Sequence, residues 1–483
     1  MALTKVSPEI LDLNNTAGTS NLRLGVNAGN SIVSGGNYNV VVGDEAGTAI
    51  TTGDSNTAIG KSSFVANTTG SSNTAIGNGA LYANTTSSNN VAVGRDALLA
   101  NTTGTAGTAV GKGSLASNTT GTDNTGLGAL ALNATTTGAL NVAVGRSALQ
   151  SNTTGANNTA VGYNSLIANT TGTGNTAVGR GAGDAITTAT NSVAVGDMAL
   201  GGHTTGTANT AVGSYCLAGA NMTGGYNTAM GQNCGANVTT GTNNSFFGWA
   251  AGDLITTTSY NTALGWMALS GAAGANNTVV GAQAGVAATG TSNTLVAVNA
   301  GYGLTSGSNN LLLGLDAGRS GSPGGNITTG SNEIVLGDEN ITEAHIKVDW
   351  TVASDQRDKT DFTALDLGLD FVNALSPVTY KWDMRSKYGD KSAEGYDLNA
   401  QTPDGTHKED WLDIGFKAQE VQALEEAAGY TTAAKKNLTV STSGDGKQMG
   451  LQYSKFVPIL VKAIQEQQAL IEALTARLTT LEG

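Results

Sequence analysis

Residues 21–340 repeat one short pattern of apolar and polar positions with a period of 17 residues, which drifts after Gly213. The unit reads Asn-x-Ala-Val-Gly, and its glycine recurs in steps of 17 from Gly43 to Gly213. An aliphatic residue precedes almost every glycine, as at Val93, and in many units a large apolar residue follows four positions after the glycine, as at Leu98. A unit of this length is too short for a helical hairpin, and its β-branched residues and Gly/Asn turns favour short strands. The pattern therefore predicts a β-solenoid in which each unit forms one coil.

About nineteen such units run from Gly25 to Gly337. Stacking places equivalent residues of neighbouring coils ~4.7–4.9 Å apart, so we expect both aliphatic columns to form continuous apolar ridges. The alanine column that includes Ala75 and Ala92 has two interpretations. It fits a thin solenoid core, or it allows neighbouring chains to approach closely. One coil has too few large apolar residues to offset the entropy lost on ordering it, so stacking and oligomerisation must contribute.

The residue after each repeat glycine varies most, and we expect it to point to solvent. It is Tyr163 in one unit, and Trp249 and Trp266 in two neighbouring units. These tryptophans should form an adjacent aromatic pair, which suits either stacking against sugar rings or packing between chains. Cys216 and Cys234 share another column of neighbouring coils, and we expect them to be buried small apolar residues. The alternative is a disulfide between them that forms after cell lysis.

Residues 355–483 have a different character and hold 34 of the 59 charged residues. Residues 362–382 predict an amphipathic helix, a proline stop and a short strand, and a further helix is expected after residues 414–421. Residues 455–482 have apolar positions spaced alternately by four and three, which predicts a coiled coil. Its seam consists of Leu460, Ile464, Gln467, Ile471, Leu474, Leu478 and Leu481.

The junction between the two regions has the motif Ser354-Asp355-Gln356-Arg357-Asp358-Lys359. A serine and a nearby lysine can act as a nucleophile and its general base. The lysine must first lose its proton, which desolvation or a cationic neighbour favours, and Arg357 could be that neighbour. Because the motif lies at a domain boundary, the candidate substrate is the chain itself.

Composition excludes several classes of protein. With 68 glycines but only 5 prolines and no triplet period, the chain is not collagen. A net charge of −13 argues against nucleic-acid binding. No apolar run approaches the ~18–20 residues that span a bilayer, and the N-terminus lacks the apolar core of a signal peptide. We therefore expect no membrane insertion and synthesis in a host cytoplasm. The three histidines lack metal-ligand spacing, and neither a metal nor a cofactor is expected.

The Asn-x-Ala-Val/Ile-Gly-x-x-Ala unit resembles the head repeats of YadA-type trimeric autotransporter adhesins, over about residues 20–340. That resemblance implies a trimeric parallel β-roll, although the period here is longer than is usual in that family.

The C-terminal region resembles the intramolecular chaperone domain of phage tailspikes and tail fibres, the S74 peptidase family. The matching blocks are Ser354-Asp355-x-Arg357-x-Lys359, Gly368-Leu369-Asp370-Phe371, Leu375-x-Pro377-Val378-x-Tyr380, Gly415-Phe416-x-Ala418-Gln419-Glu420-Val421 and Tyr453 to Glu466. The resemblance implies a domain that trimerises, templates folding of a β-rich stem and then cuts itself off. It makes Ser354 the nucleophile, Lys359 the base and Ser354–Asp355 the bond broken, with Arg357 as catalytic support.

These observations predict an all-β trimeric β-solenoid stem followed by an α+β chaperone domain that ends in a coiled coil. The expected divisions are residues 1–20 for virion attachment, 21–340 for the fibre, 341–354 for a linker and 355–483 for the chaperone, with its coiled coil at 455–482.

The expected role is a homotrimeric phage tail fibre or tailspike in the virion. Its N-terminus would bind tail or baseplate proteins, and its stem would bind a host-surface glycan or protein receptor. Tyr163, Trp249 and Trp266 are the candidate glycan contacts. The alternatives are a bacterial or prophage surface adhesin and, less favoured, a glycan-degrading tailspike. The last needs paired carboxylates, and the stem's acidic residues form no aligned pair: Asp96, Asp123, Asp184, Asp197 and Asp253. Any enzymatic activity would be a single self-cleavage, with no multiple turnover.

Overall fold

The computed structural model describes residues 11–12, 18–347, 352–390, 395–431, 436, 438–443 and 445–482. The chain divides into two compact units, Met1–Asn293 and Thr294–Gly483. Most of the expected attachment segment, residues 1–20, lies outside the described residues, as do residues 348–351 of the expected linker.

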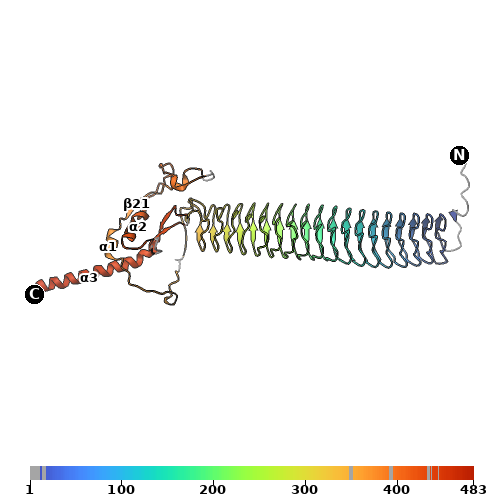
Figure 1. The fold of residues 1–483 in the computed structure, drawn as a ribbon, viewed down its shortest axis with the longest axis horizontal. Coiled ribbons are helices and arrows are strands. Elements are labelled where there is room, and N and C mark those ends of the chain that lie inside the picture. Colours follow the sequence, from blue (N-terminus) through green and yellow to red (C-terminus); the bar gives the residue numbers. More distant parts are fainter. Residues whose placement is uncertain are drawn as a thin grey trace. The chain divides into compact units, whose positions relative to one another are not determined.

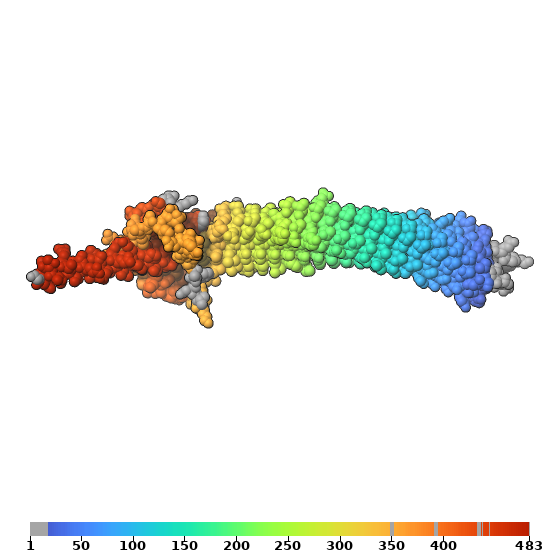
Figure 2. Space-filling view, turned by 90° about the horizontal axis from the view of Figure 1, so that it is seen from below, coloured from blue at the N-terminus to red at the C-terminus, as the bar shows by residue number. Residues whose placement is uncertain are grey.

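The first unit is a stack of coils, each of which contributes one three-residue strand to a parallel sheet (Figure 1). Its strands are β2 (Leu22–Leu24), β3 (Val40–Val42), β4 (Thr57–Ile59), β5 (Thr74–Ile76), β6 (Val91–Val93), β7 (Thr108–Val110), β8 (Thr125–Leu127), β9 (Val142–Val144), β10 (Thr159–Val161), β11 (Thr176–Val178), β12 (Val193–Val195), β13 (Thr210–Val212), β14 (Thr228–Met230), β15 (Ser245–Phe247), β16 (Thr262–Leu264) and β17 (Thr278–Val280). A short β1 (Leu11–Asp12) pairs antiparallel with β2. Equivalent positions of neighbouring units pair with each other, for example Ala75 with Ala92. The predicted β-solenoid is confirmed, and its coils pack closely from the blue to the yellow end in Figure 2.

The core of each coil differs from the prediction in one respect. The aliphatic residue four positions after the glycine is fully buried, as at Leu98 and Leu115. The one before the glycine lies outside the core, and Val110 retains 38% of its surface. Alanine occupies the inner face of most strands instead, as at Ala109. Side chains alternate along a strand, so only one face of a three-residue strand can point into the coil. The small alanine leaves room there for the leucine, which supports the thin-core interpretation of the alanine column.

Asparagine builds a hydrogen-bonded ladder inside the stack. The backbone N–H and the side-chain amide of Asn73 both donate to Oδ1 of Asn56 in the preceding coil, at 3.0 and 3.1 Å. The same amide donates to the carbonyl of Ser87, at 3.0 Å. Buried amides are costly unless they are paired, and here one residue per coil links three segments of backbone. This explains why the repeat begins with asparagine.

The repeat glycine is required by its conformation and by its contacts. Gly111 has a φ of 133°, and a Cβ added there would lie 2.6 Å from the backbone of Gly128 in the next coil. Any side chain would therefore separate the two coils or strain the turn. Cys216 and Cys234 are both buried and free, as expected.

The second unit contains the last described coils and a small α+β domain. The coil strands are β18 (Thr294–Val296), β19 (Leu311–Leu313) and β20 (Ile334–Leu336), which pair in parallel. The domain contains η1 (Gln356–Asp358), α1 (Leu369–Ala374), β21 (Val378–Tyr380), η2 (Arg385–Lys387), η3 (Leu398–Ala400), β22 (Asp413–Gly415), α2 (Ala418–Ala427), β23 (Val440–Thr442), β24 (Met449–Leu451), η4 (Tyr453–Lys455) and α3 (Phe456–Glu482). β21 pairs with β22 and β23 with β24, both antiparallel.

The first helix of this domain is shorter than predicted. The sequence predicts a helix that begins near Phe362, but α1 begins at Leu369. The Glu466 carboxylate on α3 accepts the Leu369 N–H at 2.7 Å, and this backbone hydrogen bond holds the pKa of Glu466 below its usual range. A side chain at Gly368 would collide with the same carboxylate. A partner 97 residues away along the chain thus caps the helix.

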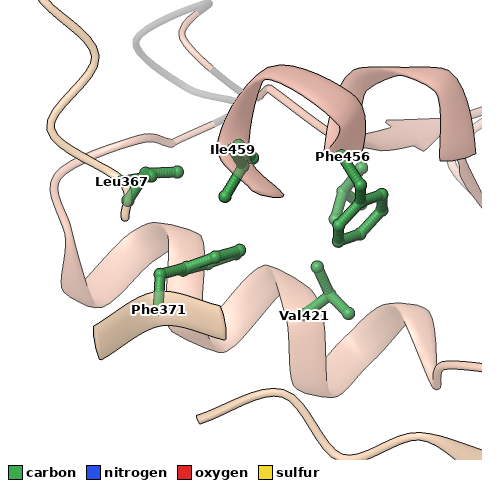
Figure 3. Packing of buried hydrophobic residues seen from close by; sticks show 6 residues of the cluster. Leu367, Phe371, Val421, Phe456 and Ile459 are labelled. Carbon is green, nitrogen blue, oxygen red and sulfur yellow. The ribbon is translucent and has the colours of Figure 1, made fainter. Parts of the chain in front are cut away.

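One apolar cluster holds α1, α2 and α3 together (Figure 3). Phe371 on α1 and Val421 on α2 pack with Phe456 and Ile459 on α3. The buried Glu425 of α2 accepts the backbone N–H of Thr439, next to β23, at 2.6 Å. The domain therefore has its own core, which holds the start of α3 in place.

Candidate active site

The structure brings together the two residues that the sequence proposes as nucleophile and base. Ser354 Oγ lies 2.6 Å from Nζ of Lys359, and both side chains are exposed. This is hydrogen-bonding distance, as a base that takes the serine proton requires. Among the site residues predicted from the sequence, this pair has the geometry that best fits a chemical step, namely transfer of the serine proton to the lysine amine.

A single turn of 3₁₀-helix, η1, produces this contact. Asp355 caps the turn, because its carboxylate accepts the backbone N–H of Arg357 at 2.9 Å. The backbone N–H of Lys359 donates to the carbonyl of Gln356 at 3.2 Å and closes the turn. Without the turn, five residues of extended chain would carry the lysine away from the serine. The local sequence alone therefore accounts for the contact.

Arg357 pairs with the residue that follows the expected cut. Its Nη2 lies 2.6 Å from the Asp355 carboxylate, and its Nε also donates to that group at 3.1 Å. The hydrogen bond from Arg357 holds the pKa of Asp355 below its usual range. Within this arrangement the charge of Arg357 is balanced by Asp355. Arg357 thus stabilises the turn and orients Asp355.

Residues 354–430 match the family described as the chaperone of endosialidase, peptidase S74. The matched segment lies in the C-terminal domain, which is therefore similar to an S74 chaperone and is called the S74 domain below. The match begins at Ser354, the serine that contacts Lys359. A search among curated proteins returns no match for this chain. The combination of a β-solenoid stem and a C-terminal S74 domain fits a tail fibre or tailspike with an intramolecular chaperone.

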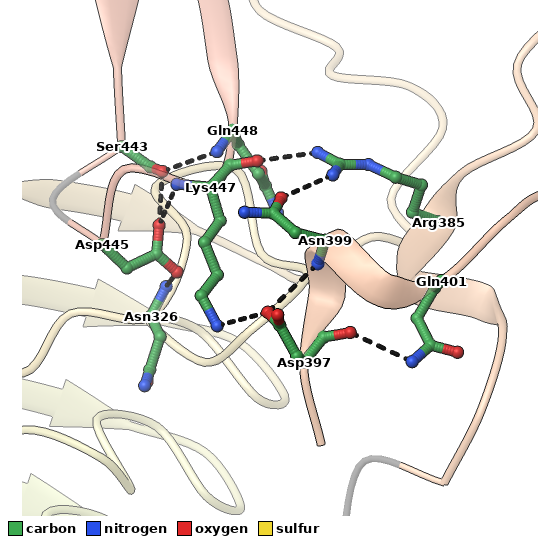
Figure 4. A network of polar contacts seen from close by, with 9 residues as sticks. All are labelled: Asn326, Arg385, Asp397, Asn399, Gln401, Ser443, Asp445, Lys447 and Gln448. Carbon is green, nitrogen blue, oxygen red and sulfur yellow. Dashed lines mark hydrogen bonds and ion pairs between the residues drawn. The ribbon is translucent and has the colours of Figure 1, made fainter. Parts of the chain in front are cut away.

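The S74 domain also contacts the end of the solenoid within the second unit (Figure 4). The Asp445 carboxylate, in the loop between β23 and β24, accepts the backbone N–H of Asn326 at 3.0 Å. Lys447 in the same loop forms an ion pair with Asp397 at 2.7 Å, and Arg385 donates to the carbonyl of Lys447 at 2.7 Å. No motif in the sequence marks this contact, because it joins residues 119 positions apart.

The exposed aromatic residues of the stem lie where the sequence places them. Trp249 and Trp266 stack with ring centroids 5.9 Å apart and planes inclined by 16°. They retain 42% and 48% of their surface. Tyr163 is also exposed, and the guanidinium of Arg146 lies 5.9 Å from the centre of its ring. These residues are far from Ser354 in sequence and belong to a different unit.

The described residues contain no group of three or more His, Cys, Asp or Glu side chains arranged to hold a metal ion. Within the same residues, no helix combines the length and the apolar character needed to cross a bilayer.

Proposed function

We propose that this protein is a phage tail fibre or tailspike, assembled as a homotrimer by its S74 domain, which then cuts the chain between Ser354 and Asp355. The observation that carries the proposal is the contact between Ser354 Oγ and Lys359 Nζ at the first residue of the S74 match. The released stem would be part of the virion and would contact the host surface. Residues 1–20 would attach it to tail or baseplate proteins.

The long helix α3 supports trimer formation. Ile459 and Ala463 face the domain core, whereas the predicted coiled-coil seam is open to solvent. Ile471 retains 50% of its surface and Leu474 62%. A seam that is apolar apart from Gln467 is unfavourable on a single solvated helix until partner helices cover it. Trimerisation through α3 would also align three stems at one end.

The contact between Asn326 and Asp445 supports the templating role. It connects the last coils to a domain that has its own apolar core. Parallel β-structures with distant contacts fold slowly and are exposed to misassembly while they do so. A preformed end would give the final coil a fixed partner, so that the remaining coils could stack on it in register.

The geometry of the bond limits how cleavage can proceed. Attack by Ser354 Oγ on the carbonyl carbon of its own residue would close a strained four-membered ring. The hydroxyl would therefore attack the equivalent carbonyl of a partner subunit, while the amine of Lys359 takes the hydroxyl proton. An ester forms, the bond to Asp355 breaks, and the leaving amine takes the proton from Lys359. Water then hydrolyses the ester and restores the serine.

This route also explains why cleavage would wait for assembly. A lysine amine acts as a base only after losing its proton, and desolvation favours that loss. Lys359 is exposed in the single chain. Packing of partner subunits around the junction would supply both the desolvation and the carbonyl to be attacked.

Intact mass and denaturing gels of the purified protein test the proposal. The unaltered protein should yield a fragment that ends at Ser354, whereas Ser354→Ala and Lys359→Gln should keep the chain whole. Ser454→Ala and Lys455→Gln are matched controls, because both residues are exposed and lie in η4 of the same domain. Both controls should be cut normally.

Trimers assembled from a mixture of altered and unaltered chains distinguish attack between subunits from attack within one chain. If Ser354→Ala chains are refolded with unaltered chains, attack between subunits predicts that some altered chains are cut. A fragment that ends at Ala353 would instead indicate attack on the preceding bond within one chain. An uncut, fully trimeric unaltered protein would refute self-cleavage.

A further inference from the structure

The basic residues of the stem occupy a single position of the repeat. Between residues 26 and 318 the sequence contains five lysines and arginines, and every one directly follows a repeat glycine: Lys61, Arg95, Lys112, Arg146 and Arg180. The nine acidic residues of the same span are spread over five positions of the unit. We call these five basic residues the cationic column.

Stacking in register turns this position into a line along the solenoid. Neighbouring strands pair without a shift, as Ile76 pairs with Val93 and Val93 with Val110. All five side chains of the cationic column are exposed. They are separated by two, one, two and two coils, so at ~4.8 Å per coil most neighbouring charges are ~10 Å apart.

Most of this positive charge is available to a ligand. Arg95 forms an ion pair with Asp96, and Arg180 with Asp197, but both pairs are exposed and therefore weak. In the described part of the chain, Lys61, Lys112 and Arg146 have no ion pair. Two acidic residues, Asp44 and Asp197, share this position at the ends of the column. Between them, from Lys61 to Arg180, the column holds five cations and no carboxylate, although the stem as a whole is acidic.

Aromatic side chains occupy the same position in other coils. Tyr163 lies between Arg146 and Arg180 in the column, and Trp249 and Trp266 occupy it further along. One face of Trp266 stacks on Trp249, and the next residue of the column is the small Ala282. No large side chain of the column therefore covers the other face of Trp266. Exposed aromatic faces suit the apolar C–H faces of sugar rings.

In a symmetric trimer the cationic column is unsuited to the symmetry axis. If it lined the symmetry axis, three copies of each cation would be buried together without partners, which is strongly unfavourable. The tryptophans share the position of these cations in the coil, so they belong to the same outer edge. This favours ligand contact over packing between chains as the role of the pair.

We propose that the cationic column and its aromatic residues bind a linear anionic polysaccharide that lies along the stacked coils. The proposal deepens the host-recognition role proposed above and rests on it for the source of the polysaccharide. A charge about every 10 Å suits a polymer with well-separated acidic sugars. Duplex DNA carries one charge per ~1.7 Å and is neutralised by broad basic surfaces, which a column one residue wide does not offer.

Binding of defined polymers tests the column. Full-length protein would be titrated with hyaluronan and alginate oligosaccharides, with neutral dextran and with a single-stranded 20-nucleotide DNA, and tryptophan fluorescence and calorimetry would be recorded. We expect binding to at least one acidic oligosaccharide that weakens as salt is raised, and none to dextran. Neutralising Lys61, Lys112 and Arg146 to glutamine should weaken that binding by ~10–100-fold, at a few-fold per exposed charge pair.

A matched control changes net charge equally at another exposed edge. Thr69→Glu, Thr103→Glu and Thr120→Glu together also lower the net charge by three, at exposed positions of neighbouring coils. This variant should keep the affinity within a few-fold. Equal loss in both variants, absence of binding to either acidic oligosaccharide, or DNA binding of equal strength would each overturn the proposal. None of these outcomes alters the cleavage test, so failure of the column is distinguishable from failure of the proposed function.

Discussion

Replacing Leu115 with alanine should destabilise the stem far more than replacing Val110, although both are aliphatic residues of one repeating unit. Leu115 is fully buried, whereas Val110 retains 38% of its surface. Leucine-to-alanine changes in well-packed cores cost about 3 kcal/mol per chain, because the cavity only partly closes. Val110→Ala removes two methyl groups worth at most about 0.8 kcal/mol each, and partial exposure reduces their sum to about 1 kcal/mol.

The difference should appear in the rate of unfolding. The loss of the β-sheet circular-dichroism signal after a jump into guanidinium would be followed for both variants and the unaltered protein. If the contact is still absent in the transition state, about 3 kcal/mol accelerates unfolding by up to ~150-fold, and about 1 kcal/mol by ~5-fold. If Val110→Ala unfolds as fast as Leu115→Ala, the outer column is also a core in the assembled protein, and the assignment of the inner face is wrong.

Three further predictions concern the turn, pH and assembly. Gly111→Ala should prevent formation of a protease-resistant stem, whereas Gly405→Ala, where no atom lies within 4 Å of the added Cβ, should cost only about 1–3 kcal/mol of backbone strain in a thermal melt. Burial lowers the pKa of His203 to about 4, from an ordinary 6.5, so the unfolded chain takes up the proton first as the pH falls. Stability should thus drop by up to about 3 kcal/mol per chain between pH 6.5 and 4 and then level off, and His203→Leu should flatten that drop. Leu474→Asp should give monomers by light scattering, whereas Thr475→Asp, outside the predicted seam, should leave trimers intact.

Much of the candidate site could be read from the sequence because it is local. Ser354, Asp355, Arg357 and Lys359 lie within one turn, and the capping carboxylate of Asp355 is part of the motif. The role of Arg357 was less accessible. The motif suggested that Arg357 is a cationic neighbour of Lys359. Only the side-chain geometry shows that its guanidinium donates to the carboxylate of Asp355.

In the stem, the repeat can be predicted from the sequence, but the face of each strand that points inwards cannot. A period of 17 with fixed glycines determines one coil per unit, in register, and it determines which residues share a column. It does not say which side of a three-residue strand faces inwards, since alternation is satisfied either way. Packing decides this, because a thin coil has room for Leu98 only if the facing strand residue is as small as Ala92.

The sequence by itself determined the repeat, the register, the junction at Ser354 and the line of cations, because each depends on residues that are close in the chain or related by a constant step. Only the tertiary structure decided where α1 begins, which aliphatic column is the core and how the S74 domain contacts the last coils. Glu466 caps Leu369 and Asp445 holds Asn326 across 97 and 119 residues. Such hydrogen bonds form only when whole helices and strands pack together, and no local sequence pattern indicates which distant residues will meet.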